Sequence, residues 1–151
     1  MRKLIATFLL SLILILTSNA QVNFSFPCKS IQQTDSLKII VSGLMDHNDL
    51  KVEWIKEEIN NDSINDWLIR NVVNSLEIDP KNMTQFDSII RKQVIDYAIS
   101  DLNKMKKYFR EGDRIFYYTT PPEYWEALYG QDGLIISRDC KIIAKLILSQ
   151  S

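Results

Sequence analysis

The longest run of helix-periodic hydrophobic residues in this chain extends from about residue 84 to residue 109. At 1.5 Å per residue this run predicts a helix about 39 Å long, enough to form the spine of a small domain. Charged residues lie away from the apolar positions, as in a helix that packs against a core on one face. The apolar stripe consists of Phe86, Ile90, Val94, Tyr97, Ala98, Leu102, Met105 and Phe109.

Three shorter segments before this helix also show helical spacing of apolar residues. Residues 34–44 predict a first helix, although the β-branched run at residues 39–41 makes a strand the alternative. Residues 50–59 predict a second helix and residues 64–76 a third. The third helix ends before Pro80, because proline disfavours the helical conformation in the residue that precedes it.

From residue 111 onward the apolar residues instead have the spacing and composition of β-strands. Strand formers occupy residues 115–119, 134–137 and 141–148. Arg138-Asp139-Cys140 is typical of a tight turn between the last two strands. Helices followed by strands are typical of the α+β class. We therefore expect a single α+β domain over residues 21–151, with its helices packed on a small C-terminal antiparallel sheet of three strands.

The first twenty residues have the layout of a signal peptide. Two basic residues precede an apolar run from residue 4 to residue 16, and Ser18 and Ala20 offer small side chains at the cleavage position. This run is too short for a membrane anchor, because crossing the hydrocarbon layer takes roughly 20 residues. Cleavage after residue 20 would leave a secreted or periplasmic protein without a membrane anchor.

Charge and cysteine content narrow the class of protein further. Removing the signal peptide takes away two basic residues and no acidic ones, so the formal net charge moves from −1 to −3. Such a charge gives no indication of nucleic acid as a partner. In an exported protein Cys28 and Cys140 are candidates for a disulfide that closes nearly the whole mature chain. Two buried, unpaired cysteines are the alternative.

Residues 117–133 read Tyr-Tyr-Thr-Thr-Pro-Pro-Glu-Tyr-Trp-Glu-Ala-Leu-Tyr-Gly-Gln-Asp-Gly and are rich in aromatic side chains. The proline pair favours a helix start, so the simplest interpretation is a short helix that Trp125 fixes to the sheet. Aromatic residues in this density also occur at binding hot spots, where they stack on a sugar or a partner protein. The candidate binding residues are Tyr117, Tyr124, Trp125, Tyr129 and Arg138.

Residues 113–143 resemble the C-terminal tail of a group of small bacterial proteins of unassigned function. Their pattern runs roughly Asp, x, hydrophobic, Trp, x, Phe, then Ser-Ser-Pro-Pro-Glu-x-Trp-x-x-Leu-x-Gly-Arg-x-Gly, a short strand and Arg-x-Gly. The matching positions are Asp113, Tyr118, Pro121, Pro122, Glu123, Trp125, Leu128, Gly130, Gly133 and Arg138. Phe116 replaces a tryptophan of the pattern, Gln131 its arginine and Cys140 its last glycine. Losing that glycine is unfavourable if the position needs a positive φ, and a disulfide at Cys140 would offset the cost. The resemblance implies a shared structural tail and no particular activity.

Candidate catalytic or metal-binding chemistry centres on His47, the single histidine, which lies between Asp46 and Asp49. These residues suit a metal site or a base with its orienting carboxylate, but aspartate and asparagine also cluster before helices as caps. The sequence has no nucleophile elbow and no phosphate-binding glycine loop, and we predict no cofactor and no metal.

The sequence as a whole favours a non-catalytic accessory or interaction protein of the cell envelope. We expect its partner to be another protein, and an immunity or inhibitor role is one specific version of this function. A small hydrolase or metal-binding protein centred on His47 is the alternative.

Overall fold

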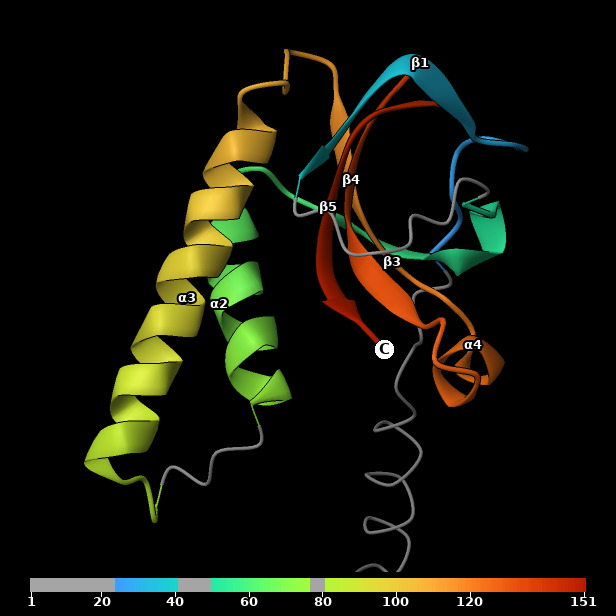
Figure 1. Ribbon diagram of the computed structural model, residues 1–151. Helices are drawn as coiled ribbons and strands as arrows, with labels where there is room; N and C mark the ends of the chain where they lie inside the picture. The colour runs from blue at the N-terminus through green and yellow to red at the C-terminus, as the bar shows by residue number, and fades with distance from the viewer. Residues whose placement is uncertain (1–23, 41–49, 77–80) are drawn as a thin grey trace, which may run out of the picture.

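Five strands in the described part of the chain form one sheet, and two long helices lie against one of its faces (Figure 1). The structure, a computed structural model, describes residues 24–40, 50–76 and 81–151. In chain order the elements are β1 (Gln32–Ile40), the 3-10 helix η1 (Val52–Trp54), β2 (Ile55–Ile59), α2 (Ile64–Ser75), α3 (Gln85–Lys106), β3 (Arg114–Thr119), α4 (Pro122–Glu126), β4 (Gln131–Arg138) and β5 (Lys141–Gln150).

The sheet is mixed and extends from residue 32 to residue 150. Its strand order is β1-β5-β4-β3-β2, with β1 parallel to β5 and the other neighbours antiparallel. The α+β class predicted from the sequence is confirmed. The prediction of a small C-terminal sheet of three antiparallel strands is wrong in its extent, because β1 and β2 from the N-terminal half form the two edges.

β1 stands where a helix was predicted over residues 34–44. The chain is extended from Gln32 to Ile40 and pairs with β5, so that Ile40 lies opposite Leu146. The β-branched residues Ile39 and Ile40 fit a pleated strand better than a helix. Pairing with a strand from the far end of the chain therefore outweighs the helical spacing of the apolar residues.

η1 and β2 stand where a helix was predicted over residues 50–59. Trp54 ends the 3-10 turn and Ile55 begins the strand, and both side chains are buried. β2 pairs with β3, and Arg114 of β3 forms an ion pair with Glu58 across the two strands. The spacing of apolar residues is again compatible with a helix, but strand pairing and burial override this weak local preference.

The elements with the longest or clearest sequence patterns match their predictions. α2 and α3 lie within the predicted ranges 64–76 and 84–109, and β3, β4 and β5 occupy the predicted strand regions. α3 begins with a capping box, in which the Thr84 hydroxyl accepts a hydrogen bond from the Asp87 N–H and the Asp87 carboxylate accepts one from the Thr84 N–H. α4 begins at Pro122, as proline at a helix start predicts.

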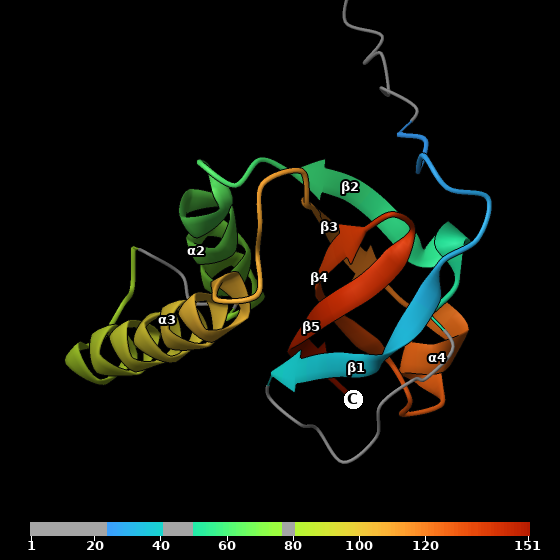
Figure 2. The same cartoon turned by 90° about the horizontal axis from the view of Figure 1, so that it is seen from above.

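Alternating side chains of β3, β4 and β5 divide the apolar core into two layers. α2 and α3 lie on one side of the sheet only (Figure 2). The helix-side core contains Ile64, Leu68, Leu102, Met105, Ile115, Leu134, Ile136, Ala144 and Leu146. The far-side core contains Trp54, Ile55, Phe116, Tyr118, Ile135 and Ile142, with Phe24, Phe26 and Tyr124 packed against it. Because apolar side chains pack against both faces of the sheet, the sequences of β4 and β5 are nearly continuous runs of apolar residues.

A disulfide joins Cys28 to Cys140, with their Cα atoms 5.8 Å apart. The predicted pairing is therefore confirmed, and the alternative of two unpaired cysteines is wrong. Asp139 and Cys140 form the turn between β4 and β5, and both have positive φ, 49° and 61°. Two-residue hairpin turns of this kind favour glycine. Cys140 therefore adopts an unfavourable backbone conformation, and the disulfide offsets its cost.

Candidate functional site

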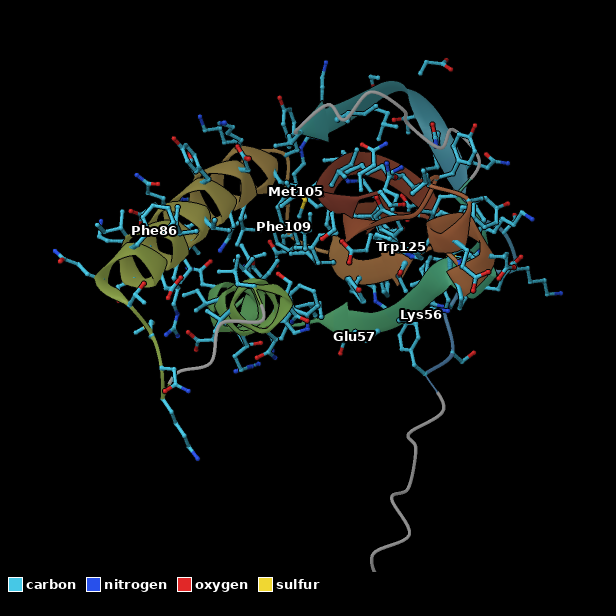
Figure 3. All side chains as sticks on the ribbon, turned by 60° about the horizontal axis from the view of Figure 1, so that its bottom comes forward. Lys56, Glu57, Phe86, Met105, Phe109 and Trp125 are labelled. Atoms are coloured by element: carbon cyan, nitrogen blue, oxygen red, sulfur yellow. A yellow bond between two sulfur atoms is a disulfide. The ribbon has the colours of Figure 1, made fainter. Side chains whose placement is uncertain are left out.

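The aromatic segment around α4 is held by Trp125 (Figure 3). The Trp125 ring lies so close to the backbone of Gly130 that a Cβ atom at that position would collide with it, and Trp125 Nε1 donates a hydrogen bond to the Thr120 carbonyl (3.2 Å). Trp125 therefore links the two ends of the segment, which fits the predicted short helix fixed to the sheet. Tyr124 packs edge-on against Trp54, with ring centres 5.2 Å apart.

The other candidate binding residues lie elsewhere on the molecule. Tyr117 belongs to the helix side of the sheet, where its ring lies 5.1 Å from that of Trp67. Tyr129 is half exposed beside Leu128, at the loop that leads into β4. The candidates are therefore spread over both faces of the sheet, and their role in binding a partner stays a prediction.

Arg138, the last candidate, forms a bidentate ion pair with Asp113. Arg138 Nε donates to Asp113 Oδ1 (2.6 Å), Arg138 Nη2 donates to Oδ2 (2.7 Å), and the Arg110 N–H donates to Oδ2 (2.8 Å). Burial alone raises the pKa of Asp113, but these hydrogen bonds and the arginine charges outweigh burial and lower it. The ion pair connects the loop after α3 to the end of β4, which gives Arg138 a structural role.

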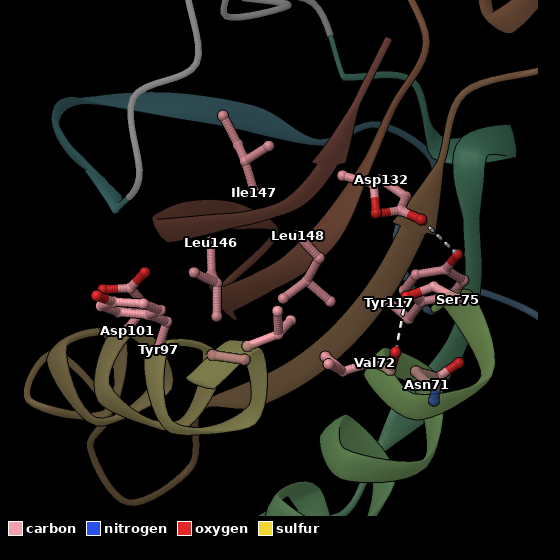
Figure 4. Close-up of a pocket in the computed structure, with 13 residues that line it drawn as sticks. Asn71, Val72, Ser75, Tyr97, Asp101, Tyr117, Asp132, Leu146, Ile147 and Leu148 are labelled. Carbon is pink, nitrogen blue, oxygen red and sulfur yellow. Dashed lines mark hydrogen bonds between the residues drawn. The ribbon is translucent and has the colours of Figure 1, made fainter. Parts of the chain in front are cut away.

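A pocket with a volume of about 330 Å³ lies between α2, α3 and the helix side of the sheet (Figure 4). This volume is at the lower end of the range for small-molecule sites, about 300–1,000 Å³. Its walls are mostly aliphatic: Leu146 and Leu148 of β5 line it together with Val72 of α2. In Figure 4 the Asp132 and Tyr117 side chains lie at one end of this apolar wall and Tyr97 and Asp101 at the other.

Asp132 is the less well satisfied of the two carboxylates that line the pocket. Its Oδ2 accepts a hydrogen bond from the Tyr117 hydroxyl at 3.3 Å, which is long for a bond between two oxygens. Its Oδ1 is buried and has no hydrogen-bond partner among the described residues. Burial raises the pKa of Asp132, and contacts with Ser149 and Tyr117 offset only part of this rise. Burial, helped by the charge of Asp132, raises the pKa of Tyr117 to about 12.

The N-terminal half of α3 extends beyond the sheet and presents an apolar face to solvent. Figure 3 shows Phe86 at the outer end of α3, far from Met105 and Phe109 at its inner end. Phe86, Ile89 and Tyr97 are 70%, 48% and 73% exposed. Their spacing places them on one side of the helix, with Gln93 between Ile89 and Tyr97. We call these four residues the outward face of α3.

The sequence prediction that put Phe86 and Tyr97 on the core-facing stripe is therefore wrong for these two residues. Leu102 of the same stripe is fully buried, and it lies about 160° around the helix from Phe86. One signal could have separated the two faces: Phe86, Ile89 and Tyr97 form a row of their own, beside the row of Val94, Ala98 and Leu102. α3 is also longer than the part of the sheet against which it packs, so none of the described elements covers Phe86 at its first turn.

Two predictions fall outside the described residues: the signal peptide at residues 1–20, and His47 with Asp46 and Asp49. In the ranges that are described, no group of three or more His, Cys, Asp or Glu side chains could hold a metal ion. None of the helices described there has the length and apolar character that crossing a bilayer requires.

Comparison of the chain with models of protein families, with curated proteins and with solved structures gives no match. The resemblance of residues 113–143 to the tail of small bacterial proteins therefore stays a prediction. Two positions of that pattern have a direct physical account, because Trp125 packs on Gly130.

Proposed function

We propose that this chain is a non-catalytic accessory protein of the cell envelope, secreted or periplasmic, that binds another protein through the outward face of α3. The observation that carries the proposal is the exposure of Phe86, Ile89 and Tyr97 on one side of a helix whose opposite side packs on the sheet. Contiguous exposed apolar side chains of this size are typical of interaction surfaces.

The outward face has the layout of a helix that enters a groove on a partner. Phe86 and Tyr97 are about 16 Å apart along the helix axis, with Ile89 between them. Burying one such side chain contributes about 1.5–3 kcal/mol, and aromatic residues dominate the binding energy of many interfaces. The polar pair Lys92 and Asp96, joined by an exposed ion pair at 3.0 Å, borders the apolar row and suits a solvated rim. We infer a partner with an apolar groove that accepts one face of a helix.

Export of the protein is supported by two features of different kinds. The first twenty residues have the pattern of a signal peptide. The disulfide between Cys28 and Cys140 is of the type that persists in oxidising compartments such as the periplasm or the extracellular space. An immunity protein or inhibitor is one specific version of this function, because such a protein acts by covering a surface and needs no catalytic group.

Photo-crosslinking in the native host tests the proposal. A photoreactive phenylalanine analogue replaces Phe86 in one variant and Lys92 in a matched control. Lys92 lies on the same helix, about 120° around from Phe86, and its side chain is 79% exposed. We expect position 86 to cross-link to one other envelope protein, identified by mass spectrometry, and position 92 to give no such product. A Tyr97→Asp substitution should abolish the product from position 86.

Three results would contradict the proposal. Position 86 could give no product, or it could give the same products as position 92, and in both cases the outward face is not a specific surface. A product that contains only a second copy of this chain would replace the proposed partner by a homodimer.

A further inference from the structure

We propose that the pocket between α2, α3 and the sheet binds a small aliphatic amine, with its ammonium group against the Asp132 carboxylate and its hydrocarbon chain along Leu146 and Leu148. The proposal goes beyond a protein-binding role, and it does not depend on the outward face of α3. Tyr97 is the one member of that face that also lines the pocket.

The carboxylate end of the pocket offers a negative charge that no cation among the described residues pairs with. Asp132 Oδ2 accepts the long bond from Tyr117, and hydrogen bonding with Ser149 offsets only part of the rise that burial gives the Asp132 pKa. A buried polar atom without a protein partner calls for an explanation, such as an ordered water, an ion or a bound ligand. An ammonium group carries three N–H donors and a positive charge, so it would neutralise the carboxylate that lines the pocket and donate a hydrogen bond to it.

The lining of the pocket selects for positive charge in the ligand. It contains two aspartates and no lysine, arginine or histidine. Asp101 forms an ion pair with Lys104 (2.6 Å), whereas no cation of the described residues pairs with Asp132. A carboxylate or phosphate ligand would therefore meet like charge at Asp132. The Tyr97 ring at the other end could also contact a cation through its face.

The middle of the pocket is suited to a short hydrocarbon chain. Val72, Leu146 and Leu148 provide aliphatic walls, and Ala98 leaves space on the α3 side. Transfer of each methylene from water to such walls strengthens binding about fourfold. We therefore expect affinity to increase from n-butylammonium to n-hexylammonium.

The test uses n-hexylammonium as the probe, with hexanoate and 1-hexanol as controls of the same length and different charge. Binding is followed by the indole N–H signals of the tryptophans in ¹H–¹⁵N NMR spectra. Trp67 contacts Tyr117 at the end of the pocket, whereas Trp54 lies in the far-side core and serves as an internal reference. Substitution of Trp67 by phenylalanine assigns its signal. We expect n-hexylammonium to shift the Trp67 signal saturably and to bind about tenfold or more tightly than hexanoate.

Three variants locate the interaction within the pocket. Asp132→Asn keeps the shape of the side chain and removes its charge, so it should weaken n-hexylammonium binding about 10- to 100-fold. Asp101→Asn is the matched control, because Asp101 is bound to Lys104, and it should change the affinity by about twofold or less. Ala98→Leu fills the pocket without changing either carboxylate and should abolish binding.

Equal affinity for the three probes, or unchanged n-hexylammonium binding by Asp132→Asn, would overturn the proposal and leave an apolar crevice. Failure of all three probes to bind would overturn it as well. Near-ultraviolet circular dichroism checks that each variant is folded. If Asp132→Asn fails that check, Ala98→Leu and the comparison with hexanoate still test the proposal, because neither alters Asp132.

Discussion

At the turn end of the β4–β5 hairpin, Asp113 accepts three hydrogen bonds from Arg138 and the Arg110 N–H. At the open end, Asp132 accepts a long bond from Tyr117, and hydrogen bonding with Tyr117 and Ser149 does not balance its burial. The pKa values of the two carboxyls shift in opposite directions. Burial raises both, but hydrogen bonding reverses the shift at Asp113 and not at Asp132.

This difference separates a carboxylate that stabilises the fold from one that is available to a ligand. A lowered pKa means that the native state favours the charged form of Asp113, so the ion pair stabilises the protein at neutral pH. A raised pKa means that the native state disfavours the charged form of Asp132, so this group lowers stability at neutral pH. Unsatisfied and electrostatically unfavourable groups of the second kind concentrate at functional sites.

Loss of the disulfide should have the largest effect on the turn end. The double variant Cys28→Ser with Cys140→Ser removes a cross-link between residues 112 positions apart. A loop of this size predicts a loss of about 3–5 kcal/mol in the free energy of unfolding. Urea unfolding of the variant and the parent chain, both without reductant, measures the loss. Adding reductant to the parent should reproduce it, and a loss below about 1 kcal/mol would show that the turn end does not depend on the cross-link.

Asp113→Asn should have the second-largest effect, because it leaves Arg138 without its charged partner. We expect a loss of about 2–3 kcal/mol at pH 7. Since the native pKa of Asp113 is lowered, its contribution is complete above the pKa of the unfolded chain and is lost as the pH falls through the native pKa. Urea unfolding at pH 7 and in acid should therefore show a deficit that shrinks below about pH 4.

The matched control for this substitution is Asp101→Asn, which removes a carboxylate from an ion pair on the surface of α3. Its cost should be about 0.5 kcal/mol or less. Equal losses for the two variants would contradict the special role of the turn end.

The sequence predicted those elements whose pattern lies in neighbouring residues along the chain. The period of α3, the strand formers of β3 to β5 and the cysteine pair are all readable along the chain, and they are confirmed. β1 and β2 were missed because their apolar spacing is compatible with a helix, and only pairing with β5 and β3 makes them strands. These pairings join segments far apart in the sequence, and the only local sign of them was the β-branched run at residues 39–41, which made a strand the alternative for β1.

The candidate pocket was missed for a similar reason. Asp132 lies in a Gln-Asp-Gly stretch that has the composition of a loop. It becomes a pocket residue because β3 and β4 pair so that Tyr117 can reach it, and because α2 and α3 cover this part of the sheet. Trp125 shows the opposite case. Its partner Gly130 is five residues away, and its structural role could be predicted from the segment alone.

The backbone of the turn provides a smaller test of the same end of the hairpin. In a Cys28→Ser background, Cys140→Gly should be more stable than Cys140→Ser by about 1–2 kcal/mol, because φ is positive at this position and glycine adopts it without steric cost. Thermal unfolding of the two double variants measures the difference. Equal stability would mean that the turn changes conformation when the disulfide is absent.

Asp132→Asn tests the open end, and among the substitutions in the hairpin it should have the smallest effect on stability and the opposite sign. The native pKa of Asp132 is raised, so the native state holds its proton more tightly than the unfolded chain. Parent stability should then fall as the pH rises from about 4 through the native pKa. The variant has no titratable group at position 132, so its gain in the free energy of unfolding over the parent should be absent in acid and reach about 0.5–1 kcal/mol at pH 7. Urea unfolding across this pH range measures it. A loss of stability at pH 7 would mean that the Asp132 carboxylate supports the fold as Asp113 does. Saturating n-hexylammonium should make the parent more stable than the variant, because the ligand stabilises the parent alone.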